Sequence, residues 1–230
     1  MFKAFIGILV IFLAFSGADA QFVFPRPEYH SHSRDVYSED PFIVHYRKEF
    51  FAVFAGDFPR FENAYAEIKT KVKRNPKDAR ALVWLGNGQT VEAGILRNLG
   101  KTKAAQELLE YSRVTLDRAV SLSPKDPNIY MMRAATLYVQ GQYWPTAEVP
   151  RAVWEELRDD CLHFIEFLGP KIKSVSVHVR GEAYGELGIA YARLGERDKA
   201  RTAFRKVIEL NPGTDYSERA QSEIERLTPK

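Results

Sequence analysis

The stretch at residues 184–212 constrains the fold of this chain most strongly, because large and small residues recur in it at helical spacing. Its aromatic and leucine side chains stand three or four residues apart, which places them on one face of a helix. Gly188 and Ala200 are small where two antiparallel helices would cross, so the two backbones can approach each other. Gly195 breaks the chain between the helices, and an Asn-Pro pair ends the second one. The stretch therefore predicts a helical hairpin with a close seam.

The same stretch resembles one tetratricopeptide (TPR) repeat, whose pattern is an aromatic residue, Leu-Gly, Tyr, then Ala, Phe and a closing Pro. The matching positions are Tyr184, Leu187, Gly188, Tyr191, Ala200, Phe204 and Pro212. The resemblance implies a helix pair that stacks against similar pairs and presents a surface to partners. It implies no reaction, because the motif leaves the partner-binding positions free.

Similar helical spacing begins at residue 42. It divides the chain into units at 42–76, 78–124, 127–170 and 178–212, followed by a capping helix at 214–228. The middle units are longer than the roughly 34 residues of a standard repeat. The expected fold is an all-α, TPR-like right-handed solenoid with extended, irregular middle repeats and a C-terminal capping helix.

Two segments in the middle of the chain have less regular patterns. In the third unit, Gly141 is expected at the turn, and the second helix is expected to begin near Pro150. Val175, Val177 and Val179 alternate with polar residues, which is typical of a strand. Because a strand would have no partner in a helical array, we interpret residues 171–180 as a loop.

The N-terminus has the pattern of a targeting segment. Lys3 precedes an apolar run at residues 4–15, and small residues at Ala18 and Ala20 follow it. This pattern predicts a signal peptide over residues 1–20, cleaved after Ala20, because the run is shorter than the roughly 20 residues that span a bilayer. Residues 21–41 predict a flexible leader. We expect an exported protein, periplasmic or secreted.

Composition and motifs do not favour catalysis or nucleic-acid binding. The net charge of +3 is small, and no catalytic motif is present. The single cysteine, Cys161, excludes a disulfide within the chain but leaves one between chains open. Glu156, Asp160 and His163 share a helix face and could seat a divalent metal, although a solvated charged face is the more ordinary interpretation. We expect no enzyme, no metal and no cofactor.

In TPR arrays, the first helices of successive units line a concave groove that accepts a peptide or a partner helix. Each unit can be aligned on its small-residue or Leu-Gly landmark. The resulting groove candidates are Arg80, Val83, Asn87, Asn128, Met132, Glu182, Glu186 and Ile189. The TPR chaperone cofactors grip a C-terminal carboxylate with Lys, Asn and Arg at such positions. Here only Asn87 agrees, and two glutamates would repel a carboxylate.

A second surface is basic. The cluster consists of Lys69, Lys71, Lys73, Arg74, Lys77 and Arg80. Lysines at the end of a helix complement the helix dipole, but this density also suits an anionic ligand such as a lipid headgroup or a polysaccharide of the cell envelope. The expected function is therefore a scaffold that binds a protein or peptide partner. One alternative is the binding of an anionic envelope ligand, and another is a metal-dependent enzyme built on Glu156, Asp160 and His163. The oligomeric state stays open.

Overall fold

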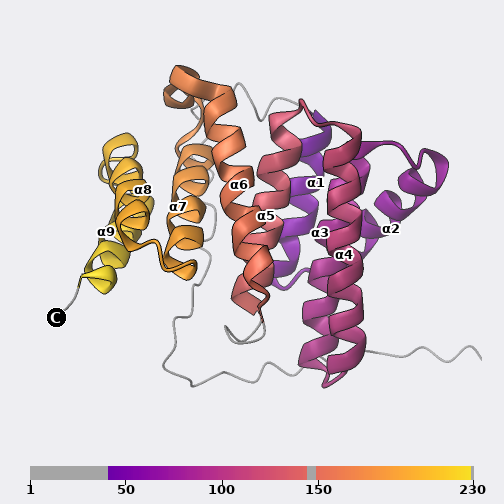
Figure 1. Cartoon of the computed structure of the whole chain (residues 1–230). Coiled ribbons are helices and arrows are strands. Elements are labelled where there is room, and N and C mark those ends of the chain that lie inside the picture. Colours follow the sequence, from indigo (N-terminus) through magenta and orange to yellow (C-terminus); the bar gives the residue numbers. More distant parts are fainter. Residues whose placement is uncertain (1–40, 144–148, 229–230) are drawn as a thin grey trace, which may run out of the picture. The chain divides into compact units, whose positions relative to one another are not determined.

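The computed structural model describes residues 41–143 and 149–228, and every element within them is a helix (Figure 1). The predicted signal peptide and nearly all of the predicted leader lie outside the described residues. In chain order the elements are α1 (Pro41–Phe51), η1 (Ala52–Ala55), α2 (Phe58–Arg74), α3 (Ala79–Asn98), α4 (Thr102–Leu122), α5 (Pro127–Tyr143), α6 (Arg151–Leu168), η3 (Gly169–Ser174), α7 (Val177–Arg193), α8 (Arg197–Leu210) and α9 (Asp215–Leu227).

The helices pack as stacked pairs. Helix α1 packs on α2, α3 on α4, α5 on α6 and α7 on α8, and the second helix of each pair also contacts the first helix of the next. The first helices α3, α5 and α7 contact one another in order, and α9 continues the series. This arrangement confirms the predicted all-α, TPR-like solenoid, with α9 packed on the last pair.

Local sequence explains where the helices begin and end. The Asp78 carboxylate accepts hydrogen bonds from the backbone N–H groups of Arg80 and Ala81 at the start of α3, both at 3.1 Å. Thr214 and Ser217 form a reciprocal capping box at the start of α9. Between α7 and α8, Gly195 has φ of +83°, a conformation that glycine adopts without strain.

Glycines mark the seams where paired helices come closest. A Cβ atom on Gly188 would lie 2.5 Å from the Phe204 ring, and one on Gly86 would lie 2.6 Å from Leu116. Gly141 of α5 meets the Trp154 ring of α6 in the same way. The turn predicted at Gly141 is therefore wrong: this residue lies inside α5 and is the small residue of its pair.

The segment interpreted as a loop is mostly helical. Residues 169–174 form η3, and α7 begins at Val177, where the Ser176 side chain accepts a hydrogen bond from the Val179 N–H at 3.2 Å. Val175 and Val179 are both buried against α6 and η3. Their alternation reflects two separate contacts with the core rather than a strand.

The first pair is joined to α3 by aromatic side chains. Phe50 of α1 packs edge-on against Phe61 of α2, with ring centroids 5.3 Å apart, and 4.9 Å from Trp84 of α3. Phe50 and Trp84 are each 1% exposed. This cluster fixes α3, on which the candidate site begins. Among the described residues, no helix has the length and apolar character needed to cross a membrane.

Candidate partner-binding face

The candidate site is the side of the first helices that lies next to the seam with their paired second helices, about a quarter of a turn around each helix. On α7, Gly188 points toward α8. At about 100° per residue, Glu182, Gly185 and Ile189 point about 60–120° away from Gly188. We call this side of α3, α5 and α7, together with the adjoining side of α9, the first-helix face. The backbone of this face is accessible at Gly185, because a Cβ atom there would meet no described atom within 4 Å.

The three candidates on α3 have different environments. Arg80 is exposed, and its guanidinium lies 5.2 Å from the centroid of the Phe42 ring of α1. Val83 is 1% exposed and packs in the core, so its side chain is not available to a partner. Asn87 is half-buried and donates a hydrogen bond to the Thr136 hydroxyl of α5 at 3.3 Å, which joins two first helices.

The two candidates on α5 were placed from Ala134. The close contact with α6 lies at Gly141, two turns further along the same face, so the positions of Asn128 and Met132 fall two turns before those that Gly141 would give. Accordingly, the Asn128 amide is bonded to Asp126 at the start of α5, and Met132 packs against the core. The residue that corresponds to Glu182 is Ala135, which is half-buried.

On α7 the candidates lie close together. The Glu182 carboxylate lies 3.2 Å from His178 Nε2, and His178 Nδ1 lies 2.6 Å from the Tyr216 hydroxyl of α9. Ile189 is half-buried against α8 and the third pair. Glu186 is only 6% exposed. Burial raises the pKa of the Glu186 carboxyl well above its ordinary value, and the negative charge of Glu182 raises it further.

Sequence reasoning missed the aromatic residues beside these glutamates. Burial first, then the negative charges of Glu182 and Glu186, raise the pKa of the hydroxyls of Tyr138 of α5 and Tyr216 of α9. The ring of Tyr216 packs onto Gly181, where a Cβ atom would lie 2.5 Å away. Gly181 lies seven residues, about two helical turns, before Gly188, and that spacing was the available signal for a second close contact.

The basic cluster is a separate surface. All six of its side chains are exposed, at the end of α2 and the start of α3. The Lys69 ammonium lies 4.2 Å from the centroid of the Tyr65 ring, and that of Lys71 lies 5.8 Å from Phe42. Some of these cations therefore also pack against the aromatic cluster of the first pair.

The three candidate metal ligands on α6 are engaged by neighbouring helices. Arg133 of α5 donates two hydrogen bonds of 2.7 Å to the Asp160 carboxylate. Arg113 of α4 lies 2.6 Å from Glu156, and the His163 ring stacks on Tyr130 with centroids 3.9 Å apart. Burial raises the pKa of Asp160 to about 6, against the opposing effect of Arg133. Within the described ranges, no three His, Cys, Asp or Glu side chains are placed to hold a metal.

Cys161 is fully buried between the third and fourth pairs. Burial raises the pKa of its thiol well above the ordinary value. A disulfide to another chain needs an accessible thiolate, so the structure does not favour the pairing that the sequence left open.

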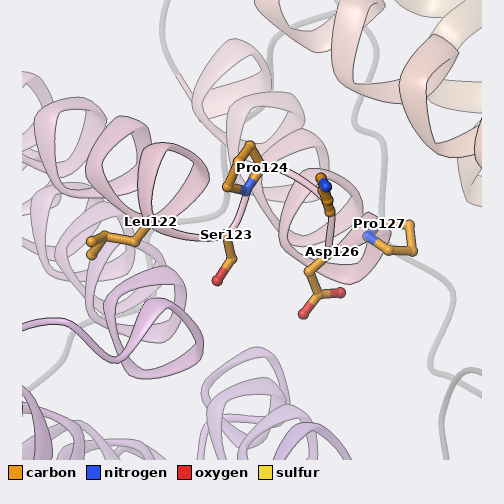
Figure 2. A pocket seen from close by; sticks show the side chains of 6 residues that line it. Leu122, Ser123, Pro124, Asp126 and Pro127 are labelled. Atoms are coloured by element: carbon orange, nitrogen blue, oxygen red, sulfur yellow. The ribbon is translucent and has the colours of Figure 1, made fainter.

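A hollow in the described surface lies at the connection between α4 and α5. It is lined by Leu122, Ser123, Pro124, Lys125, Asp126 and Pro127, all from one short segment (Figure 2). Asp126 is already used in this segment, because its carboxylate accepts a hydrogen bond from the Asn128 N–H at 3.0 Å. The hollow belongs to a helix connection and gathers no groups from other elements.

Comparison with known protein families gives a match at the last helix pair. Residues 181–214 match the family described as tetratricopeptide repeat, and a search of curated proteins found no match to the chain. The matched residues cover nearly all of α7 and the whole of α8, including the contact between Gly188 and Phe204. The chain thus carries a tetratricopeptide repeat at residues 181–214 as the last pair of an all-α array.

Proposed function

We propose that the chain is a scaffold that binds an extended segment or a helix of a partner protein on its first-helix face. The observation that carries the proposal is the continuous series of helices α3, α5, α7 and α9, on which Gly185 leaves open space for a partner. TPR repeats generally mediate binding to protein partners, and they are typically not catalytic. The chain is accordingly proposed to be no enzyme.

Export is part of the same proposal. The basic Lys3, the apolar run after it and the small residues before Gln21 support a signal peptide that is removed. N-terminal sequencing of the protein purified from its native compartment should then read from Gln21. A protein that still begins at Met1 would contradict export by cleavage.

A second candidate function is the binding of an anionic envelope ligand by the basic cluster. The observation that favours it is that all six cationic side chains are exposed within one short stretch of chain. Such binding would weaken steeply as the ionic strength rises, because exposed charges are screened by salt. A partner held on the first-helix face would depend less on salt.

The test is to block the first-helix face without disturbing the fold. Gly185→Trp places a large ring where no described atom lies within 4 Å of the added Cβ. Arg205→Trp on the exposed side of α8 is the matched control. After proximity crosslinking in the native compartment, the Gly185 variant should lose the captured partner and the Arg205 variant should keep it. Equal capture by both variants would refute the proposal.

A further inference from the structure

Glu186 is an unusual residue for the packed side of a helix. It is 6% exposed, and its Oε2 atom is buried without a hydrogen-bond partner among the described residues. A buried polar atom that is left unpaired lowers the stability of the folded chain. An apolar residue of similar size would avoid that loss, so packing alone does not explain a carboxyl group here.

No cation of the described chain compensates this carboxyl. The negative charge of Glu186 raises the pKa of the Tyr138 and Tyr216 hydroxyls and of the Cys161 thiol, and the charge of Glu182 raises the pKa of Glu186 itself. Arg219 and Glu223 of α9 act on Tyr138, and Glu223 lies 2.8 Å from Arg226. Of all these charges, only that of Glu182 affects the ionisation of Glu186, and it is a like charge.

The carboxylate of Glu182, one helical turn before Glu186, is held in position by neighbouring side chains. His178 lies between the Glu182 carboxylate, at 3.2 Å, and the Tyr216 hydroxyl, at 2.6 Å, so α7 and α9 fix its position together. The side chain of Glu182 is 22% exposed, whereas the whole of Glu186 is 6% exposed. One carboxyl group thus stands at the surface, linked through His178 to the Tyr216 hydroxyl, and the next one along the helix is buried.

On the basis of the proposed function, we propose that the first-helix face recognises a basic side chain of its partner, a lysine or an arginine, whose cationic group enters between Glu182 and Glu186. A cation favours the ionised form of both carboxyl groups, which a neutral hydrogen-bond donor does not. Its N–H groups supply donors to the unpaired oxygen.

The shape of the face suits a long side chain rather than a bare ion. Lysine and arginine carry their charge on an aliphatic stem, which can pass apolar surface before the charge reaches a buried acceptor. Gly185 lies three residues after Glu182 on the same side of α7, and has no described atom within 4 Å of its added Cβ. A partner backbone can therefore approach α7 beside Glu182, the more exposed of the two glutamates.

The experiment uses a set of fluorescent peptides of one length, in an alanine and serine background, with one fixed central residue. The fixed residue is lysine, arginine, norleucine, glutamine or glutamate, and binding to the purified chain is measured by fluorescence anisotropy. The lysine and arginine peptides should bind at least about tenfold more tightly than the norleucine peptide, because norleucine supplies neither a positive charge nor an N–H donor to the unpaired Glu186 Oε2 atom. Equal affinity across the set, or no binding by any peptide, would overturn the inference.

Three variants test which residues hold the cation. Glu186→Met and Glu182→Gln should each reduce affinity for the lysine peptide about tenfold or more, whereas Glu209→Met on the exposed side of α8 should leave it unchanged. Glu186→Met should also unfold at a higher urea concentration than the natural chain, which a purely structural glutamate would not do. Unchanged affinity in the Glu186 and Glu182 variants would refute the cation site.

The cation inference and the proposed function fail separately. If neutral peptides bind as well as basic ones, and Gly185→Trp abolishes their binding, the face still binds partners and only the preference for a basic residue is refuted. If Gly185→Trp captures the native partner as well as the control does, the proposed function itself is refuted.

Discussion

Two glycines on α7, three residues apart, allow the seam of the TPR repeat to be tested with matched substitutions. A Cβ atom on Gly188 would lie 2.5 Å from Phe204 Cε1 and 2.7 Å from Cδ1 and Cζ, whereas one on Gly185 would meet no described atom within 4 Å. Carbon atoms in contact normally stay about 3.5–4.0 Å apart. Because Phe204 is 2% exposed, its ring has little room to move.

The expected magnitudes follow from two effects. Replacing glycine by alanine inside a helix stabilises it by about 0.5–1 kcal/mol, so Gly185→Ala should be stabilising. Gly188→Ala has the same gain but also overpacks the seam, at a cost of about 1–3 kcal/mol. The difference between the two variants removes the helix term and should be about 1–3 kcal/mol, with Gly188→Ala the less stable.

Urea denaturation followed by circular dichroism measures this difference, provided that both variants give the same slope with denaturant. A changed slope would mean that the repeats no longer unfold together, and the midpoints would then be compared for α7 and α8 by hydrogen exchange. Equal stability of the two alanine variants would refute the assignment of Gly188 to the seam.

Three further predictions concern buried charge and the basic cluster. Glu186→Met should stabilise the fold by about 1–3 kcal/mol, and the gain should be larger at pH 8 than at pH 5. The folded-state pKa of Glu186 is raised, so the stability that its protonated carboxyl contributes is complete below the ordinary pKa of 4.5 and is lost as the pH rises through the folded-state pKa. A gain that does not change with pH in urea titrations would contradict this. Asp160→Ala should cost about 3–5 kcal/mol, because it leaves the Arg133 guanidinium without its bidentate partner, whereas Asp159→Ala at an exposed pair should cost less than about 1 kcal/mol; similar melting temperatures would count against it. Replacing Lys69, Lys71 and Lys73 by glutamine should leave partner capture intact at all salt concentrations, and loss of capture in this variant would favour the anionic-ligand function instead.

The sequence predicted the structure correctly where a residue type fits only one structural position. The spacing of residues 184–212 predicted both helices of the last pair and the close approach at Gly188, because only small residues fit where two backbones meet. Gly141 could be read two ways, since glycine serves both in turns and in seams. The sequence alone could not decide, and the choice of Ala134 displaced the α5 candidates by two helical turns.

The chemistry of the candidate site was harder to predict, because it depends on contacts between helices. Glu186 was expected on an open groove, but the packing of α7 against other helices leaves it only 6% exposed. The ion pairs of Arg133 with Asp160 and of Arg113 with Glu156 join residues far apart in the chain. No spacing rule along one helix could have removed the α6 carboxylates from the possible metal ligands.

The central claim is that a partner binds on the first-helix face, and site-specific photocrosslinking tests it most directly. Benzoylphenylalanine would be placed at position 185 on α7 in one protein and at position 205 on α8 in another, and each would be irradiated in the native compartment. The account predicts a crosslinked partner from position 185, with a lysine or arginine close to the crosslinked residue, and none from position 205. A partner crosslinked from position 205 and not from position 185 would contradict it.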